Sequence, residues 1–383
     1  MDRSSRALLV ACVLTLCAAL LGGPRAAASG AAPPWESAGP YPASYDLRDH
    51  GKVTGVREQD HKSTCWIIAA TGSLESCLLP GALYDFSENN LANHQGSLLD
   101  FGGRADSELS TAYFARWDGP VLERQDPYPF PGASPEGLRP ALHVQEVLFL
   151  PPRVGAGDDA ALKWAITAYG GVDATMCWTV GEDALDRTTY AFSAWQPGLT
   201  LNHHVTCVGW DDAYPASSFA TRPPGPGAWL VKNTWGTDWG LAGYFWISYH
   251  DLYFGGQMAV FTGAEPASNH DAIYQYDALG RSDTYGYGTE AASFASRFSC
   301  AGSGTLSAVS FYTPVPDSLY EVRVARSVAE LPAAAVAGSG TIPVAGYHTV
   351  RFAEPQAVTA GKDFVVAVTL VTPGSTEPVP LEH

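Results

Sequence analysis

The chain has 383 residues, 46% of them hydrophobic, so it is long and apolar enough for two or three folded domains. Its 39 acidic residues outnumber its 22 basic ones, and the formal net charge is −17. This acidic balance, with no basic run to offset it, excludes nucleic acid as an expected partner.

The first 28 residues have the pattern of a signal peptide. Arg3 and Arg6 precede an apolar run over residues 7–21, and small residues at 26–29 offer a cleavage site. The run is too short for a transmembrane helix, and no later stretch is long and apolar enough to be one. The sequence therefore predicts a secreted protein with no membrane span. A lipid on Cys12 is disfavoured because few apolar residues precede it.

Five cysteines remain once residues 1–28 are removed, and an odd number in an exported protein predicts one free, reactive thiol. They are Cys65, Cys77, Cys177, Cys207 and Cys300. Their spacing fits neither a metal site nor a dense disulfide framework, so no metal and no cofactor are expected. Whether the other four pair or are simply buried stays open.

Helices precede strands in the first part of the chain. Residues 29–41 are rich in Gly, Ala and Pro, which predicts a flexible leader before a domain that begins at Pro42. Helices are predicted at residues 65–79, 85–93, 107–117 and 158–168, and strands at 172–178, 203–211, 227–233, 243–249 and 257–262. This order indicates an α+β domain and not an alternating parallel sheet.

The helical pattern ends at a linker near residues 265–269. Short alternating runs separated by Gly and Pro turns then occupy residues 305–313, 319–325, 346–352 and 364–371. Such runs are typical of an antiparallel β-sandwich.

Cys65 stands at the start of the first predicted helix, and this position affects the balance between thiol and thiolate. The positive end of the helix dipole favours thiolate over thiol, and thiolate is the reactive form. Ser63 or Thr64 can serve as the N-cap of this helix. The alternative is that Cys65 is one more buried core cysteine, a common role for free cysteines.

A reactive thiol needs a base and a group that orients the base. The strand at residues 203–211 offers His203 and His204, and the strand end at Asn233 offers a side-chain oxygen for an imidazole nitrogen. Trp235 can cover that hydrogen bond from water. Gln59 can donate to a developing oxyanion together with the Cys65 backbone N–H. Taken singly, each of these residues has a structural explanation.

Three motifs together resemble the papain-like cysteine peptidases over roughly residues 42–262. They are Gln59 with Cys65-Trp66, Asn202-His203-His204-Val205, and the run Asn233-Thr-Trp-Gly-Thr-Asp-Trp-Gly240. The resemblance implies a two-lobed α+β fold and hydrolysis of peptide bonds in protein or peptide substrates through an acyl thioester. It implies that Cys65 is the nucleophile in a thiolate–imidazolium pair, His203 the base, Asn233 its orienting partner and Gln59 an oxyanion donor.

Two neighbouring histidines leave a choice of base. Alignment on Val208-Gly209-Trp210 puts His203 in the family's catalytic position. Alternation along a strand then turns His204 to the opposite face.

The sequence also departs from the family pattern. Lys62-Ser63-Thr64 stand where the family usually has Cys-Gly-Ser before the nucleophile. Asp100 stands where a cysteine partner is usual, so we expect a Lys62–Asp100 ion pair in place of the local disulfide. His204 replaces the usual Ala beside the main specificity pocket, which favours polar or acidic substrate side chains or a narrower pocket. There is no room for a long inhibitory propeptide between the predicted signal peptide and domain.

The chain as a whole resembles the prokaryotic branch of the family, which carries a C-terminal lectin-like domain. The resemblance rests on residues 86–91, 109–113, 209–212 and 273–280. The expected organisation is a signal peptide (1–28), a leader (29–41), a peptidase domain (42–264) and a lectin-like β-sandwich (270–383), which ends where further strands are expected. A glycan or cell-surface partner would contact exposed aromatic residues such as Tyr285, Tyr287 and Phe294, unless these belong to the core.

Two other functions remain open. One is a catalytically impaired papain-like scaffold whose β-domain binds a glycan or a protein; the changes at Lys62, Ser63 and His204 favour it. The other is a cell-wall amidase of a different Cys-His fold, against which the Gln59–Cys65 spacing and the Asn-Thr-Trp-Gly run speak.

Overall fold

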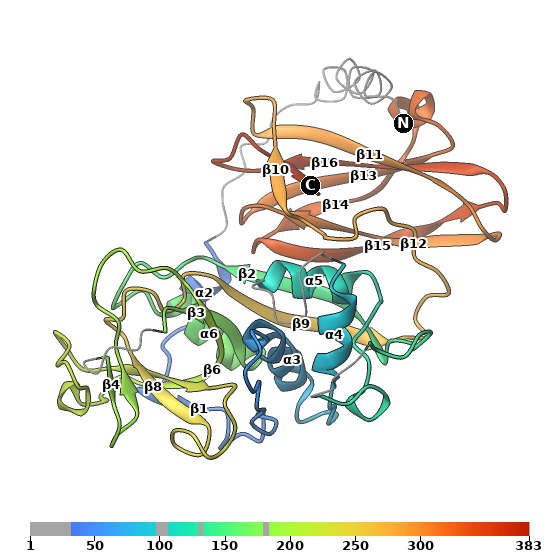
Figure 1. Ribbon diagram of the computed structural model, residues 1–383. Coiled ribbons are helices and arrows are strands. Elements are labelled where there is room, and N and C mark those ends of the chain that lie inside the picture. The colour runs from blue at the N-terminus through green and yellow to red at the C-terminus, as the bar shows by residue number, and fades with distance from the viewer. Residues whose placement is uncertain (1–31, 97–105, 129–132, 179–183, 383) are drawn as a thin grey trace. The chain divides into compact units, whose positions relative to one another are not determined.

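The computed structural model describes residues 32–96, 106–128, 133–178 and 184–382, and divides into two compact units (Figure 1). The N-terminal unit comprises Pro34–Asp271 with Ala278–Gly280, and the C-terminal unit comprises Ala272–Asp277 and the chain from Arg281 onward. The predicted signal peptide lies outside the described residues. Within those ranges, none of the helices combines the length and the apolar character needed to cross a bilayer.

The N-terminal unit begins with helices and continues mainly with strands, so the predicted α+β class is confirmed. Its helices are α2 (Pro34–Ser37), α3 (Cys65–Leu78), α4 (Glu88–His94), α5 (Ser107–Ala115) and α6 (Ala160–Ala168), with 3₁₀ turns η1 (Glu123–Gln125) and η2 (Ala216–Ser218). Its strands are β1 (Ser44–Asp46), β2 (Leu142–Leu150), β3 (Val172–Met176), β4 (Leu185–Asp186), β5 (Ala191–Phe192), β6 (His203–Asp211), β7 (Ala228–Lys232), β8 (Tyr244–Ser248) and β9 (Met258–Pro266).

Helix α3 is the buried centre of the N-terminal unit. Its residues from Cys65 to Ser76 are all buried, as expected for a helix that is apolar on nearly every side. It packs against β3, β6 and β9. Gly72 permits this approach, since a Cβ there would lie 3.1 Å from the Thr206 hydroxyl of β6. Pro80 follows the extended residue Leu79 and ends the helix.

The strands of this unit are hydrogen bonded in the order β2-β9-β3-β6-β7-β8-β5-β4, with β1 added on β6. Neighbours are antiparallel except for β5 and β8, which are parallel. Strand β6 is buried from His203 through Trp210, so its two histidines are fixed by packing on both sides of the strand.

Strand β2 is absent from the sequence-based prediction. The chain at Leu142–Leu150 pairs with β9, but its register shifts between Val144 and Glu146 and again between Glu146 and Val147. Such irregularities interrupt the alternation of buried and exposed side chains by which strands are recognised. Strand β2 was therefore missed because its bulge interrupts the two-residue pattern.

Helix α2 falls inside the segment predicted as a flexible leader. Its Trp35 ring lies 5.7 Å from that of Trp164 in α6. This part of the leader is therefore packed against the N-terminal unit. Helix α6, predicted from residue 158, begins at Ala160 with Asp159 as its N-cap, while the Asp158 carboxylate accepts from the Val154 N–H at 2.9 Å.

The C-terminal unit is built from antiparallel strands, as predicted. They are β10 (Asp283–Tyr285), β11 (Ala291–Ser299), β12 (Gly304–Thr313), β13 (Ser318–Ala325), β14 (Val336–Ile342), β15 (Gly346–Val358), β16 (Asp363–Val371) and β17 (Val379–Leu381), with a 3₁₀ turn η3 (Val328–Ala333). One sheet has the order β11-β16-β13-β14, β12 pairs with β15, and β10 pairs with β17.

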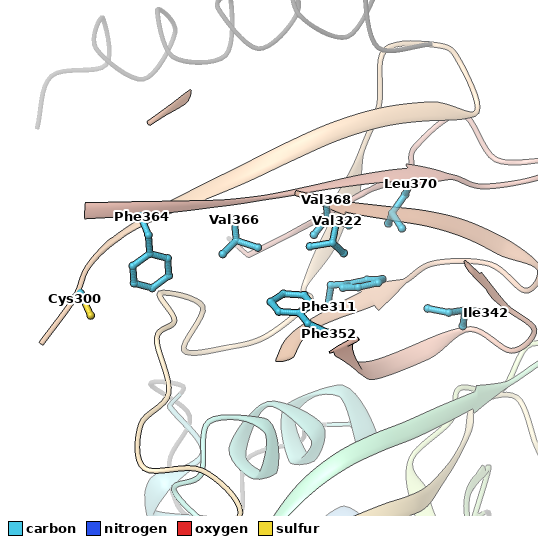
Figure 2. Close-up of a cluster of buried hydrophobic side chains, with 9 residues drawn as sticks. All are labelled: Cys300, Phe311, Val322, Ile342, Phe352, Phe364, Val366, Val368 and Leu370. Atoms are coloured by element: carbon cyan, nitrogen blue, oxygen red, sulfur yellow. The ribbon is translucent and has the colours of Figure 1, made fainter. Parts of the chain in front are cut away.

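Two layers of this unit enclose one apolar core, shown in Figure 2. Alternate residues of β16 enter it, as the period of two requires. These are Phe364, Val366, Val368 and Leu370. Phe311 of β12 and Phe352 of β15 face them from the other layer. Of the three aromatic residues for which a sugar contact or a core position was open, Phe294 packs against this core, whereas Tyr285 and Tyr287 are exposed.

Replacing Leu370 with alanine should destabilise the C-terminal unit by about 2–5 kcal/mol, because the side chain is fully buried and would leave a cavity. Hydrogen exchange of peptides from β13 and β16 measures the opening free energy. Val336→Ala is the control, since Val336 is 44% exposed. Equal losses in the two variants would contradict this account of the core.

Candidate active site

A pocket of about 430 Å³ lies where the N-terminal end of α3 meets β3 and β6. Cys65, His203 and Gln59, three of the four predicted site residues, line it. The fourth, Asn233, has no exposed surface and is hydrogen bonded to His203. The folded chain thus brings together residues that are up to 174 positions apart in the sequence, as read from Gln59 and Asn233.

Cys65 is the first residue of α3, and only 8% of it is exposed. The N-cap is Thr64, but its side chain makes no capping hydrogen bond. The thiol therefore lies beside the unpaired N–H groups of a 14-residue helix, whose dipole favours negative charge there. The backbone N–H of His204 also reaches the sulfur and favours the thiolate.

The orientation of His203 is set by Asn233. Nε2 of His203 lies 2.8 Å from Oδ1 of Asn233, and the same oxygen accepts from the Thr234 backbone N–H at 2.9 Å. Because a backbone N–H can only donate, the second contact fixes which end of the amide faces the ring. Nε2 therefore carries a proton, and Nδ1 is the nitrogen left to accept one.

Trp235 shields this hydrogen bond from water. Its ring stacks on His203 with centroids 4.9 Å apart and an interplanar angle of 25°. Trp178 meets Trp235 edge-on at 4.6 Å. The aromatic cover keeps the ring and its partner in a poorly solvated environment, in which their hydrogen bond is stronger than in water.

The side-chain amide of Gln59 is also held in one orientation. Its Oε1 accepts from the Thr234 hydroxyl and, at 3.2 Å, from the indole N–H of Trp235. An indole N–H is a donor only, so the oxygen must face Trp235. Nε2 donates one hydrogen to the Lys62 carbonyl at 2.5 Å. Its second hydrogen remains for a ligand in the pocket.

Tyr128 links the Gln59 segment to the start of α3. Its hydroxyl donates to the Gln59 carbonyl and also lies 2.9 Å from the hydroxyl of Thr64. Since the phenol has a single hydrogen, Thr64 is the donor in the second contact. Tyr128 therefore ties the backbone of Gln59 to Thr64, the residue that precedes Cys65.

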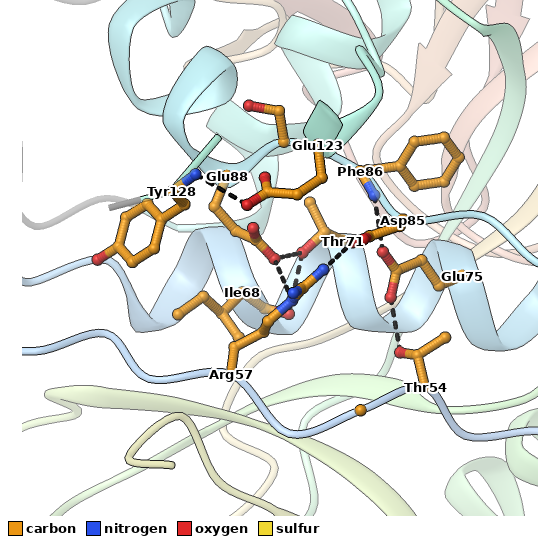
Figure 3. Close-up of polar contacts among 12 residues, drawn as sticks. Thr54, Arg57, Ile68, Thr71, Glu75, Asp85, Phe86, Glu88, Glu123 and Tyr128 are labelled. Carbon is orange, nitrogen blue, oxygen red and sulfur yellow. Dashed lines mark hydrogen bonds and ion pairs between the residues drawn. The ribbon is translucent and has the colours of Figure 1, made fainter. Parts of the chain in front are cut away.

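A cluster of polar side chains positions the chain that leads to Gln59 (Figure 3). Arg57 contacts Asp85 and Glu88, and Glu88 accepts from Thr71 of α3 at 3.2 Å. The backbone of Arg57 accepts from Gly236 N–H at 2.9 Å. The segment is thus tied on one side to α3 and α4, and on the other to the loop after β7.

His204 borders the same pocket but has a different partner. Its Nδ1 lies 2.8 Å from Oδ1 of Asp173, whose side chain is completely buried. Asp173 is opposite Thr206 in the β3–β6 register, and residues two apart on a strand share a face. His204 is therefore paired with β3, whereas His203 is paired with Asn233 at the end of β7.

Comparison with known proteins identifies the family. Residues 41–260 match the family model of the papain family cysteine proteases. The chain belongs to this family. The resemblance inferred from the sequence is confirmed. Residues 273–383 match a second family model, the lectin like domain.

The papain-family relatives include cathepsin L of Sarcophaga peregrina, 29% identical over 222 residues that cover 53% of this chain and 58% of that protein. Pro-cathepsin H of Mus musculus is 27% identical over 219 residues, which cover 55% and 61%. The chain therefore spans less than two thirds of the length of these relatives.

Solved structures extend the similarity to the C-terminal unit. The clostridial cysteine protease Cwp84 after propeptide cleavage has a TM-score of 0.77 and 25% identity, covering 88% of this chain and 86% of that one. A second structure holds the cysteine protease and lectin-like domains of Cwp84, a surface layer associated protein of Clostridium difficile. Its TM-score is 0.76 at 24% identity, with 89% and 78% covered.

In this papain-family site, burial acts against the charged form of each member of the Cys65–His203 pair. It raises the pKa of the Cys65 thiol and lowers the pKa of His203 to about 4, with Asn233 opposing the second shift. If a proton moves from Cys65 to His203, two opposite charges form together, and their attraction opposes the cost of desolvation.

The remaining predicted features have mixed outcomes. All five cysteines after residue 28 are free, and Cys77 is the one that is partly exposed. In the described part of the chain, no three His, Cys, Asp or Glu side chains gather to hold a metal ion. The expected Lys62–Asp100 ion pair involves a residue outside the described ranges.

Sequence reasoning missed Asp173, Tyr128 and Thr234. Asp173 had a detectable signal, a carboxylate inside the otherwise apolar strand Val172–Met176, because unpaired buried charges are rare. Thr234 lies within the recognised Asn-Thr-Trp-Gly run. Nothing in the sequence joins Tyr128 to Gln59, since their contact depends on how distant loops pack.

The pH dependence of Cys65 alkylation tests the electrostatics of the pair. The unreactive state with neutral thiol and imidazolium should form only near or below pH 4, because the His203 pKa is lowered to about 4. Labelling by iodoacetamide, followed at Cys65 by mass spectrometry, should hold its rate down to about that pH. His203→Ala should lose this acid limb. An acid limb near pH 6.5, the value of a solvated imidazole, would contradict the burial argument.

Proposed function

We propose that this chain is a secreted cysteine endopeptidase that hydrolyses peptide bonds through an acyl thioester. One observation carries the proposal: a histidine whose Nε2 is committed to Asn233 lines the same pocket as a thiol at a helix N-terminus. A nucleophile, a base and an orienting group are the components of covalent amide hydrolysis. In this proposal they are Cys65, His203 and Asn233.

The first step is acylation. Cys65 Sγ attacks the substrate carbonyl carbon while its proton is held by Nδ1 of His203, as a thiolate–imidazolium pair. The negative oxygen of the tetrahedral intermediate accepts from the Cys65 backbone N–H and from the second Nε2 hydrogen of Gln59. His203 then gives its proton to the departing amine, the C–N bond breaks, and an acyl thioester remains on Cys65.

The second step is deacylation. Water occupies the place of the departed amine and gives a proton to His203 Nδ1 as it attacks the thioester carbon. The same two donors stabilise the second oxyanion. The C–S bond breaks, the sulfur recovers the proton from His203, and the carboxylic acid leaves. Asn233 keeps the ring in the required tautomer through both steps.

We also propose that the enzyme acts outside the cell and that its C-terminal unit engages a glycan or a cell-surface partner. The signal-peptide pattern of residues 1–28 supports export. The match of residues 273–383 to a lectin like domain supports the second role. Tyr285 and Tyr287 are 50% and 39% exposed and are candidates to stack on a sugar ring.

Replacing the nucleophile and each histidine separately tests the catalytic assignment. Cys65→Ala and His203→Ala should each lower kcat/KM on fluorogenic peptides by at least about 10³-fold. The reason is that removing one member of a catalytic unit costs about as much activity as removing the whole unit. His204→Ala should still permit labelling of Cys65 by iodoacetamide.

Either of two results would overturn the assignment. Loss of Cys65 acylation in His204→Ala alone would make His204 the base. Cleavage that persists in Cys65→Ala would exclude the thiol mechanism. Circular dichroism of each variant separates loss of activity from loss of fold.

Gln59→Ala tests the oxyanion role. It should lower kcat by about 10² to 10³-fold, because a donor that acts on the developing oxyanion is removed. Alkylation of Cys65 by iodoacetamide, which forms no oxyanion, should change far less. Gln196→Ala is the matched control, because Gln196 is exposed and does not line the pocket. Equal losses in cleavage and alkylation would instead assign Gln59 a structural role.

A further inference from the structure

A short loop, residues 60–64, joins the two candidate oxyanion donors. It runs from Gln59, whose side-chain Nε2 donates one of its two hydrogens to the Lys62 carbonyl, to Cys65, the first residue of α3. Asp60 and Ser63 are exposed, and Asp60 has a left-handed backbone with a φ of 56°. The five cysteines after residue 28 are all free, so no disulfide among them secures the loop. Its shape therefore depends on non-covalent contacts.

Tyr128 contacts this segment at its start, its middle and its end. The Tyr128 hydroxyl donates to the Gln59 carbonyl at 2.9 Å and accepts from the Thr64 hydroxyl at 2.9 Å. Between these two contacts, Nζ of Lys62 lies 5.7 Å from the centre of the Tyr128 ring, within the range of a cation–π contact. Thr64 is completely buried, so its hydroxyl is held in place. One side chain thus spans the loop.

Tyr128 is itself held by its surroundings. Its backbone N–H donates to Oε1 of Glu123 at 2.8 Å. Two residues before it, the buried carboxylate of Asp126 accepts from the side chains of Asn89 at 2.6 Å and Asn90 at 3.0 Å, both in α4. Burial raises the pKa of Tyr128 above its usual value of 10, so the hydroxyl keeps the hydrogen that it donates. The contact with the loop is therefore anchored to α4.

The two oxyanion donors are carried by different parts of the N-terminal unit. The Gln59 backbone N–H donates to the Thr234 carbonyl at 2.7 Å, and Oε1 of Gln59 accepts from the indole of Trp235, so Gln59 follows the loop after β7. Cys65 belongs to α3. Both donors must point at one oxygen of the tetrahedral intermediate. A misplacement of about 1 Å can cost about 10²-fold in rate, so a contact that bridges the two parts affects catalysis.

We propose that Tyr128 is a positioning residue of this site, and that its hydroxyl sets the separation of the oxyanion donors of Gln59 and Cys65. The inference rests on the proposed peptidase function. Among the described residues, those that line the pocket do not include Tyr128 or Thr64, so the effect passes through the loop. It operates in acylation and in deacylation, because each step forms an oxyanion.

Tyr128→Phe tests the inference, because it removes the hydroxyl and keeps the ring beside Lys62. The kcat on fluorogenic peptides should fall by about tenfold, a part of the 10²- to 10³-fold effect of losing a whole oxyanion donor, while KM changes far less. Alkylation of Cys65 by iodoacetamide, which forms no oxyanion, should keep its wild-type rate. A purely structural role would slow cleavage and alkylation together.

Thr64→Val removes the hydroxyl at the other end of the contact and keeps a β-branched side chain of similar size. The Thr64 side chain makes no capping hydrogen bond, so α3 loses no cap in this variant. The kcat should fall here too, and alkylation of Cys65 should again be spared. This second variant keeps the test decisive if Tyr128→Phe fails to fold.

Tyr253→Phe is the matched control. The Tyr253 hydroxyl also donates to a backbone carbonyl, that of Gln196 at 2.6 Å, and also accepts one hydrogen bond, from the Leu199 N–H at 2.9 Å. Tyr253 is partly exposed, as Tyr128 is, and lies outside the pocket lining. Its loss of two hydrogen bonds should leave kcat unchanged.

A double variant tests whether Tyr128 acts through the donors. Gln59→Ala leaves the Cys65 backbone as the remaining donor of the two, so their separation no longer matters. Adding Tyr128→Phe to Gln59→Ala should then cost much less kcat than it costs in the unmodified chain, because residues that act as one unit are not additive.

The possible results distinguish this role from the peptidase function. Wild-type kcat in Tyr128→Phe, equal losses of cleavage and alkylation, an equal loss in Tyr253→Phe, or losses that multiply in the double variant would each overturn the role of Tyr128 while the peptidase function stands. If Cys65 of the unmodified chain is not alkylated and no peptide is cleaved, the proposed function fails and the role of Tyr128 fails with it.

Discussion

The packing of α3 against β6 is the constraint on which the site depends. Cys65 begins the helix and His203 begins the strand, so the depth and angle of this contact decide whether thiol and imidazole share a pocket. The contact is close because Gly72 presents no side chain to Thr206. The contact is stable because both elements are buried along almost their whole length. Removing such surface from water is the main favourable contribution to folding.

Hydrogen bonds from polar residues of the N-terminal unit orient the side chains of the site, which apolar packing alone cannot do. Hydrophobic packing has no direction, whereas hydrogen bonds do. Thr234 illustrates the difference: its backbone fixes the amide of Asn233, and its hydroxyl contacts the amide of Gln59. Tyr128 acts similarly between Gln59 and Thr64. A few donors therefore determine which atoms of the site face the pocket.

Two of the departures from the family pattern, Ser63 and His204, line the pocket, and His203 keeps its hydrogen bond to Asn233. His204 is the clearest case, because the strand that supplies His203, the proposed catalytic base, also supplies a second imidazole next to it. Asp173 gives that second ring its own partner, so the two rings have distinct hydrogen bonds and do not compete for Asn233.

The sequence by itself determined the fold class of each unit. It also pointed to the four residues, Gln59, Cys65, His203 and Asn233, that the structure brings together. The run at residues 364–371 predicted the strand β16, and the structure shows that alternate side chains of this strand enter the core, since a strand repeats every two residues. The position of Cys65 at a helix start, and the Asn-Thr-Trp-Gly run after a strand, predict the thiol chemistry that we propose, because these are local patterns. Only the tertiary structure decided that β2 is a strand, that Asp173 lies beside His204, and that Tyr128 holds Gln59. These depend on a bulged register and on contacts between distant segments, and no local pattern of residues encodes which distant partner a buried polar group will meet.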